Sequence, residues 1–134
     1  MVRPMCRVLI PDPLERAFQL VVTLFGTMGF SLTNPETNKI TTWTDDGDQI
    51  EIPSAEVILR ISSGAMQNVQ FWTNSREDIF VSWEEGHGEC TFSIYFDGVD
   101  SDLAVTLVGK FVESVLISLR NRYGEGTALT IAFE

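Results

Sequence analysis

The feature that most constrains how this chain can fold is a long stretch in which apolar residues recur at every second position. On each side of it lies a segment whose apolar residues recur at helical spacing. From residue 37 to residue 97, short runs of alternating apolar and polar residues are separated by turn residues, which is typical of half-buried β-strands. Asp45-Asp46-Gly47-Asp48 stands between two such runs and predicts a tight hairpin, because Asp and Gly tolerate a positive φ. We expect strands at residues 39–44, 49–52, 55–61, 67–73, 78–84 and 90–97.

The flanking segments carry the signals of helix ends as well as a helical period. Asp12 is placed to cap the first helix, with Pro13 at the first helical position and Glu15 at the third. Gly26 and Gly29 are expected to end it. Its apolar residues recur at helical spacing: Leu14, Phe18, Val21, Val22, Phe25 and Met28.

A second, longer helix is expected from Asp100 or Ser101 to about Tyr123, with Gly124 just beyond its end. Its core stripe consists of Leu103, Leu107, Phe111, Val115 and Leu119. A last strand at residues 127–133 carries Leu129, Ile131 and Phe133 on one side.

This order of elements predicts an α+β fold. We expect an antiparallel sheet of about five to seven strands, with the N-terminal helix and the long C-terminal helix packed on one face and the final strand at the C-terminus. The chain has 134 residues and no internal repeat or linker, so residues 1–134 are expected to form a single domain. The other face of the sheet must then meet water or a partner.

The acidic residues are concentrated in the middle of the chain. The whole chain has 19 acidic and nine basic residues, for a net charge of −10. Residues 45–102 contain 13 of the acidic residues and two basic ones, a net charge of −11, so the remainder has +1. Nucleic acid and anionic lipid both need cations on the protein, so this charge argues against both as direct partners. A basic protein partner, or solubility alone, accounts for the excess.

The N-terminus and the cysteines favour a cytoplasmic location. The apolar run at residues 8–10 is too short for a signal sequence, and Pro11 follows it at once. The longest apolar stretch, residues 17–30, is broken by polar residues and glycines and is too short for a membrane span. Cys6 and Cys90 lie far apart, with no spacing typical of a disulfide framework, and are expected to be free, partly buried thiols.

We find no catalytic signature and expect no catalytic residue, cofactor or metal site. His87, the only histidine, stands between two glycines and is interpreted as an exposed turn residue, although Glu85 and Glu89 could join it at a metal. The acidic hairpin turn resembles a fragment of a calcium loop, but it lacks the alternating ligands and the closing glutamate. Cys90 alternates toward the core. The chain is therefore not expected to be an enzyme.

The less apolar side of the expected strands combines large aromatic residues with carboxylates, as protein interfaces do. The alternative is that these rings lie under loops or at a homodimer contact. We predict a partner-binding surface made of this side and the acidic turns: Asp45, Asp46, Asp48, Trp72, Phe80, Glu84, Glu85, Glu89 and Tyr95.

Three motifs in the second half of the chain are Phe71-Trp72, Val81-Ser82-Trp83-Glu84-Glu85 and the run Thr-Phe-Ser-Ile-Tyr-Phe-Asp-Gly-Val at residues 91–99. With the long helix and last strand that follow, this half resembles the immunity proteins of bacterial contact-dependent growth inhibition and related polymorphic toxin systems. The resemblance implies a cognate toxin domain, usually a nuclease, that is neutralised by tight one-to-one binding. Acidic side chains that imitate phosphates would suit a basic nuclease, and we expect a monomer.

Two other classes of function remain open. A small acidic secretion chaperone or adaptor acting as a dimer is the first, although such proteins usually have a helix between the strands in mid-chain. The second is an enzyme or ligand-binding module with a pocket between the sheet and the helices.

Overall fold

The structure of the protein, a computed structural model, describes residues 3–73 and 77–133. The strands are β1 (Pro4–Ile10), β2 (Ile40–Trp43), β3 (Gln49–Ile52), β4 (Asn68–Trp72), β5 (Asp78–Glu85), β6 (Cys90–Tyr95) and β7 (Ala128–Phe133). The helices are α1 (Leu14–Thr27), α2 (Val57–Ser62), α3 (Ser101–Ser114) and α4 (Arg120–Tyr123). A π-helical segment, Val115–Leu119, joins α3 to α4, so the predicted long C-terminal helix is continuous to Tyr123.

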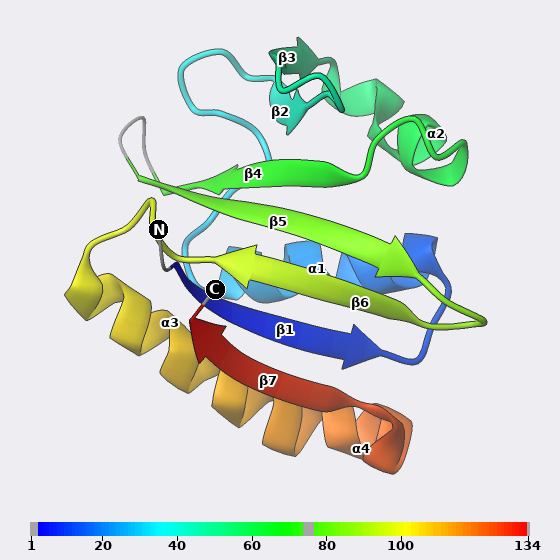
Figure 1. Cartoon of the computed structure of the whole chain (residues 1–134), viewed down its shortest axis with the longest axis vertical. Helices are drawn as coiled ribbons and strands as arrows, with labels where there is room; N and C mark the ends of the chain where they lie inside the picture. Colours follow the sequence, from blue (N-terminus) through cyan, green and yellow to red (C-terminus); the bar gives the residue numbers. More distant parts are fainter. Residues whose placement is uncertain (1–2, 74–76, 134) are drawn as a thin grey trace.

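The main sheet has five strands in the order β4-β5-β6-β1-β7, and β2 and β3 form a separate two-stranded sheet. Neighbouring strands pair antiparallel throughout both sheets. Helix α1 and the C-terminal helix cover one face of the main sheet, and the other face is open (Figure 1). The α+β class, the placement of both helices on one face and the final strand are confirmed.

The N-terminal strand β1 lies inside the sheet. Arg7 pairs with Ser93 of β6 on one side and with Thr130 of β7 on the other. Local sequence pattern left the position of this segment undetermined. Because β1 lies between β6 and β7, it joins the middle of the chain to the C-terminal strand, and among the described residues it is the hydrogen-bonded neighbour on which β7 depends.

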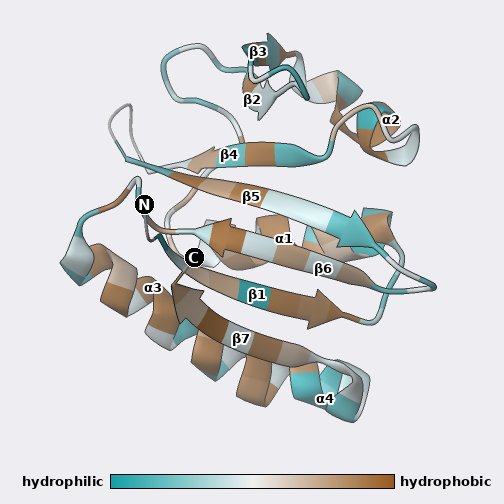
Figure 2. Ribbon diagram, in the orientation of Figure 1, coloured by the Kyte–Doolittle hydropathy of each residue, from teal (hydrophilic) through white to brown (hydrophobic). Residues whose placement is uncertain are grey.

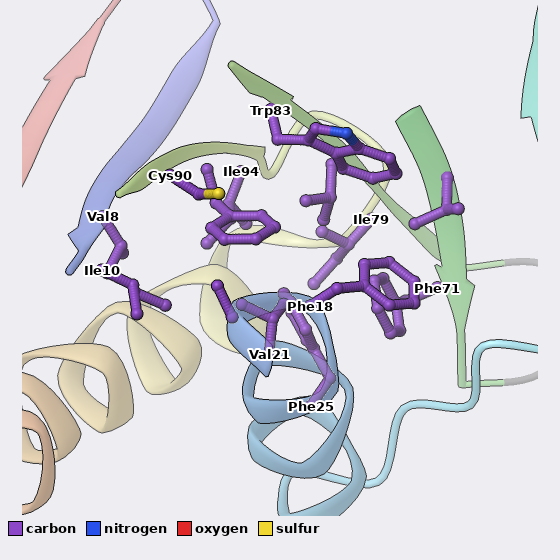
Figure 3. Close-up of a cluster of buried hydrophobic side chains, with 14 of the residues drawn as sticks. Val8, Ile10, Phe18, Val21, Phe25, Phe71, Ile79, Trp83, Cys90 and Ile94 are labelled. Atoms are coloured by element: carbon purple, nitrogen blue, oxygen red, sulfur yellow. The ribbon is translucent and has the colours of Figure 1, made fainter. Parts of the chain in front are cut away.

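The hydrophobic core lies between the sheet and the two long helices (Figure 3). Phe25 of α1 is fully buried, and its ring stacks on Phe71 of β4 with centroids 4.4 Å apart. The same ring meets Phe111 of α3 edge-on at 5.4 Å. Three elements from distant parts of the sequence therefore meet at Phe25.

Residues 55–61 form a helix, so the prediction of a strand there, and of an uninterrupted run of strands through the middle of the chain, is wrong. A 3-10 turn leads into α2, and the Glu56 carboxylate binds the Arg60 guanidinium one helical turn later, at 3.1 Å. Ile61 is buried, whereas Leu59 is 72% exposed. Four apolar residues within five positions fit either period, so the local pattern could not distinguish the two structures.

The β4 edge of the main sheet is covered by other parts of the chain. Ser31 exchanges two backbone hydrogen bonds with Trp72, each 2.8 Å long. The Asn68 side chain accepts from the Trp43 N–H at 2.7 Å and donates to the Trp43 carbonyl at 3.0 Å. Thr42 Oγ1 also donates to the Asn68 carbonyl at 2.7 Å. These bonds attach the β2–β3 hairpin to β4, and the edge is not left bare.

The observed start of α3 agrees with the sequence prediction, whereas the observed start of α1 differs from it. Helix α3 begins at Ser101, within the predicted start, and Asp100 caps it, because the Asp100 Oδ1 accepts the Leu103 N–H at 2.9 Å. Helix α1 begins one residue later than expected: Pro13 takes the cap position, and no side chain caps the helix. Asp12 instead accepts from the Tyr123 hydroxyl at 2.8 Å. This carboxylate therefore ties the end of α4 to the start of α1.

Candidate binding surface

The open face of the sheet brings together three of the predicted contact residues. Phe80 of β5 pairs with Tyr95 of β6, and their ring centroids lie 6.1 Å apart. Glu84 lies on the same side of β5, four residues further along, and pairs with Thr91. Both rings are half-buried and Glu84 is exposed. The predicted alternation of β4, β5 and β6 is confirmed, because the side chains that it directs inward, such as Val69, Val81 and Ile94, lie in the core.

A cluster of carboxylates stands where β5 turns into β6. Glu84, Glu85 and Glu89 are exposed, and the turn between them is closed by a hydrogen bond from the Gly86 N–H to the Glu89 carbonyl at 2.8 Å. In the described ranges, none of the three carboxylates forms an ion pair. We call these three residues the acidic end of the sheet. A cationic surface could approach them without displacing an internal partner.

The hairpin aspartates form a second acidic group on the smaller sheet. Asp45, Asp46 and Asp48 are exposed at the turn between β2 and β3. Gly47 has the positive φ, +86°, that the sequence predicts for a tight turn. This hairpin lies beyond β4, so the two acidic groups occupy different sheets (Figure 1).

Trp72 lies on the predicted side of β4 but is only 9% exposed, so it does not offer contact area. Both sides of β4 are covered, because Val69, Gln70, Phe71 and Trp72 are all buried. Alternation identifies the side that faces away from the helices; it does not reveal that a distant hairpin covers that side.

The open face also carries arginine side chains, which the sequence did not predict there. The Arg3 guanidinium lies 4.5 Å from the centre of the Tyr95 ring, a cation–π contact. Arg7 of β1 lies on the same face, because it pairs across the strands with Ser93 of β6, which in turn pairs with Ser82 of β5. Both arginines come from the segment whose place in the sheet the sequence left open. The open face is therefore mixed in charge near Tyr95 and acidic at the end of β5.

A hydrogen-bonded chain links the hairpin to the sheet through Gln70. The indole Nε1 of Trp43 donates to Gln70 Oε1 at 2.9 Å, and Gln49 Nε2 donates to the same atom at 3.1 Å. Gln70 Nε2 in turn donates to Asp78 Oδ2 at 2.7 Å. Burial raises the pKa of Asp78 above its ordinary value; the Gln70 hydrogen bond opposes this shift, and the charge of Asp97 adds to it.

This raised pKa predicts that Asp78→Asn stabilises the protein at pH 7. The folded state holds the Asp78 proton more tightly than the unfolded chain, so deprotonation costs stability at every pH above the folded pKa. The free energy of unfolding of the variant should exceed that of the wild type at pH 7. This advantage should fade as the pH falls toward 3.8, the ordinary value. Urea titrations at several pH values measure it.

Asp46→Asn is the matched control, because it makes the same chemical change at an exposed turn. It should alter the free energy of unfolding by less than about 0.5 kcal/mol. A loss of stability in Asp78→Asn at pH 7 would show that the bond from Gln70 to the charged carboxylate outweighs the cost of burial.

The remaining candidate groups lie in ordinary structural positions. His87 is exposed in the turn between β5 and β6. Cys6 and Cys90 are free and buried, and burial raises the pKa of each thiol to about 11. Among the described residues, no group of three or more histidine, cysteine, aspartate or glutamate side chains could hold a metal ion.

A groove of about 730 Å³ lies outside the sheet, between α1 and the C-terminal helix. It is lined by residues that include Gln19, Leu24, Ile58, Ser114, Ser118 and Arg122. The ligand-binding interpretation of the sequence placed a pocket between the sheet and the helices; this groove instead lies between helices.

No protein-family model matches the chain, and neither the curated proteins nor the solved structures contain a significant match. Within residues 3–73 and 77–133, no helix has the length and apolarity needed to cross a membrane.

Proposed function

We propose that this protein is an immunity protein that neutralises a cognate bacterial toxin, a basic nuclease domain, by stoichiometric binding. The observation that supports it most directly is the acidic end of the sheet, where three exposed carboxylates lack a cation within the described chain. Unpaired surface carboxylates of one sign produce a field that attracts a basic partner and speeds association.

The open face beside this end has the composition of an interface core. Phe80 and Tyr95 are half-buried rings next to each other, with Ser82 and Ser93 in the adjacent row. Rings supply apolar contact area, and the surrounding carboxylates supply steering and orientation. We therefore centre the proposed contact on Phe80, Tyr95, Glu84 and Glu89. Glu85 pairs with the buried Cys90 and stands at the rim of the helix side of the sheet. The hairpin aspartates form a second region of acidic contact.

The test is the binding of this protein to the basic toxin domain encoded by the neighbouring gene, measured at several salt concentrations. The double variant Glu84→Lys/Glu89→Lys should weaken binding by at least about tenfold at low salt, because two attractive charges become repulsive. It should also flatten the dependence of the affinity on salt concentration.

The matched control is Glu36→Lys/Glu113→Lys, which makes the same change in net charge at two exposed residues away from the acidic end. Its affinity should stay within about threefold of wild type, because net charge alone acts through screened long-range forces. Equal weakening in both double variants would exclude the acidic end as the contact. A neighbouring gene product that does not bind would exclude the immunity function.

A secretion chaperone or adaptor is the second candidate, and α2 favours it. Such proteins usually have a helix between strands in mid-chain, and α2 lies between β3 and β4. This removes the difference in element order that counted against the class. The neighbouring gene distinguishes the two candidates, because a secreted effector without toxin activity would favour the chaperone.

A further inference from the structure

The two edge strands of the main sheet, β4 and β7, differ in whether other parts of the chain cover them. Strand β4 is covered by Ser31 and by the β2–β3 hairpin, whereas β7 pairs only with β1 among the described residues. In an antiparallel strand, alternate residues direct both N–H and C=O groups away from the existing neighbour. The free edge of β7 therefore presents a row of unpaired backbone groups over Ala128–Phe133.

Strand β7 also lacks the features by which proteins block an exposed edge. Its sequence, Ala-Leu-Thr-Ile-Ala-Phe, contains no charged residue and no proline. Natural edge strands are usually protected by lysine, proline, a bulge or a covering segment, because a bare apolar edge pairs readily with another strand. This edge is therefore suited to pairing with another strand.

Apolar side chains continue from the edge onto the neighbouring helix. Phe133 is 73% exposed and Ile131 is 54% exposed on β7, and Val105 is 73% exposed on α3. A groove of about 250 Å³ runs between them, with Val108 and Phe96 also in its wall. Figure 2 shows the hydrophobic colour along β7 and on the adjacent turns of α3. Large exposed apolar residues gathered in this way mark an interaction surface.

The charge of this region indicates what covers it. Residues 101–133, which hold the C-terminal helix and β7, contain three basic and three acidic residues, so their net charge is zero, in contrast to the net −11 of residues 45–102. A basic partner would be drawn to the acidic part of the molecule. Two copies with a charge of −10 each would repel least where the acidic excess is absent, so this surface suits a second copy of the chain.

In place of the monomer expected from the sequence, we propose that the protein forms a two-fold symmetric dimer in which β7 of one copy pairs antiparallel with β7 of the other. A two-fold axis makes an edge strand complementary to itself, because each unpaired N–H meets the C=O of the same strand in the second copy. The two five-stranded sheets join into one, and the Phe133, Ile131 and Val105 side chains of each copy pack beside the joint against apolar side chains of the other copy. The acidic end of each sheet stays free.

The test is the mass of the purified full-length protein, measured by sedimentation and light scattering over a range of concentrations. The wild type should have twice its chain mass of 15.0 kDa. Val105→Lys/Phe133→Lys should raise the dissociation constant of the dimer at least about tenfold, because each copy would then bury two lysine charges without a partner in an apolar contact. Both side chains are exposed in the single chain, so the variant should keep its far-ultraviolet circular dichroism spectrum.

Leu59→Lys is the control, because it changes an equally exposed apolar residue to lysine on α2, away from β7. It should dimerise like the wild type. A wild type with a mass of 15.0 kDa at every concentration would overturn the proposal. So would a dimer that Leu59→Lys disrupts and Val105→Lys/Phe133→Lys does not, because the contact would then lie at α2.

Discussion

Phe25→Ala should lower the free energy of unfolding by about 3–5 kcal/mol, the range measured when a fully buried phenylalanine is truncated in a core. Phe25 is completely buried and contacts three other rings, Phe30, Phe71 and Phe111. These rings come from the loop after α1, from β4 and from α3. The truncation therefore leaves a cavity where three segments meet, and no single neighbour can close it. Since a domain is stabilised by about 5–15 kcal/mol, the loss is a large fraction of the total.

Urea unfolding at one fixed protein concentration measures this loss, with two controls that scale it. Phe25→Leu keeps most of the buried volume and should lose less than half as much as Phe25→Ala. Leu59→Ala removes an exposed side chain from a helix and should change the free energy of unfolding by less than about 0.5 kcal/mol. A loss below about 1.5 kcal/mol in Phe25→Ala would mean that the aromatic cluster can repack, and that the core is less tightly specified than its ring contacts indicate.

The parts of the fold that sequence predicted are those that local physics determines. Helical spacing identified α1 and α3, and placed the start of α3 at Asp100 or Ser101, where the structure has it. The turn at Gly47 was predictable for the same reason. Alternation gave the two sides of β5 and β6, since each strand must bury one side against the helices.

The parts that sequence missed depend on contacts between distant residues. Residues 57–61 carry apolar side chains compatible with strand or helix, and the contact of Ile61 with the core decides between them. Strand β1 could not be placed, because its neighbours lie some 85 and 125 residues away, as the pairs Arg7–Ser93 and Arg7–Thr130 show. No pattern within a short window contains that information.

The candidate site shows the same division between local and distant effects. The acidic end of the sheet was predictable, because Glu84, Glu85 and Glu89 flank a glycine turn where carboxylates remain in water. The burial of Trp72 was not, because it depends on the segments that cover β4. The cations on the open face were missed as a direct consequence of the unplaced β1.

Gly98→Ala should destabilise the protein by about 2–4 kcal/mol, because no side chain fits at this position without moving the backbone. A Cβ added to Gly98 would lie 2.5 Å from the carbonyl oxygen of Asp78 and 2.9 Å from its Oδ1. The two segments are already joined there by a hydrogen bond from the Asp78 N–H to the Gly98 carbonyl. A backbone atom cannot turn aside as a flexible side chain can, so the start of β5 must shift and carry with it the bond from Gln70 to Asp78.

Gly109→Ala makes the same chemical change with the opposite expected sign. Gly109 lies within α3, where an added Cβ meets no atom within 4 Å. Alanine there should stabilise the protein by about 0.5–1 kcal/mol, because glycine has the greater freedom to lose when a helix forms. Urea unfolding of both variants under identical conditions gives the comparison. If Gly98→Ala is as stable as the wild type, residue 98 does not approach Asp78 closely, and the turn into α3 is set back from the start of β5.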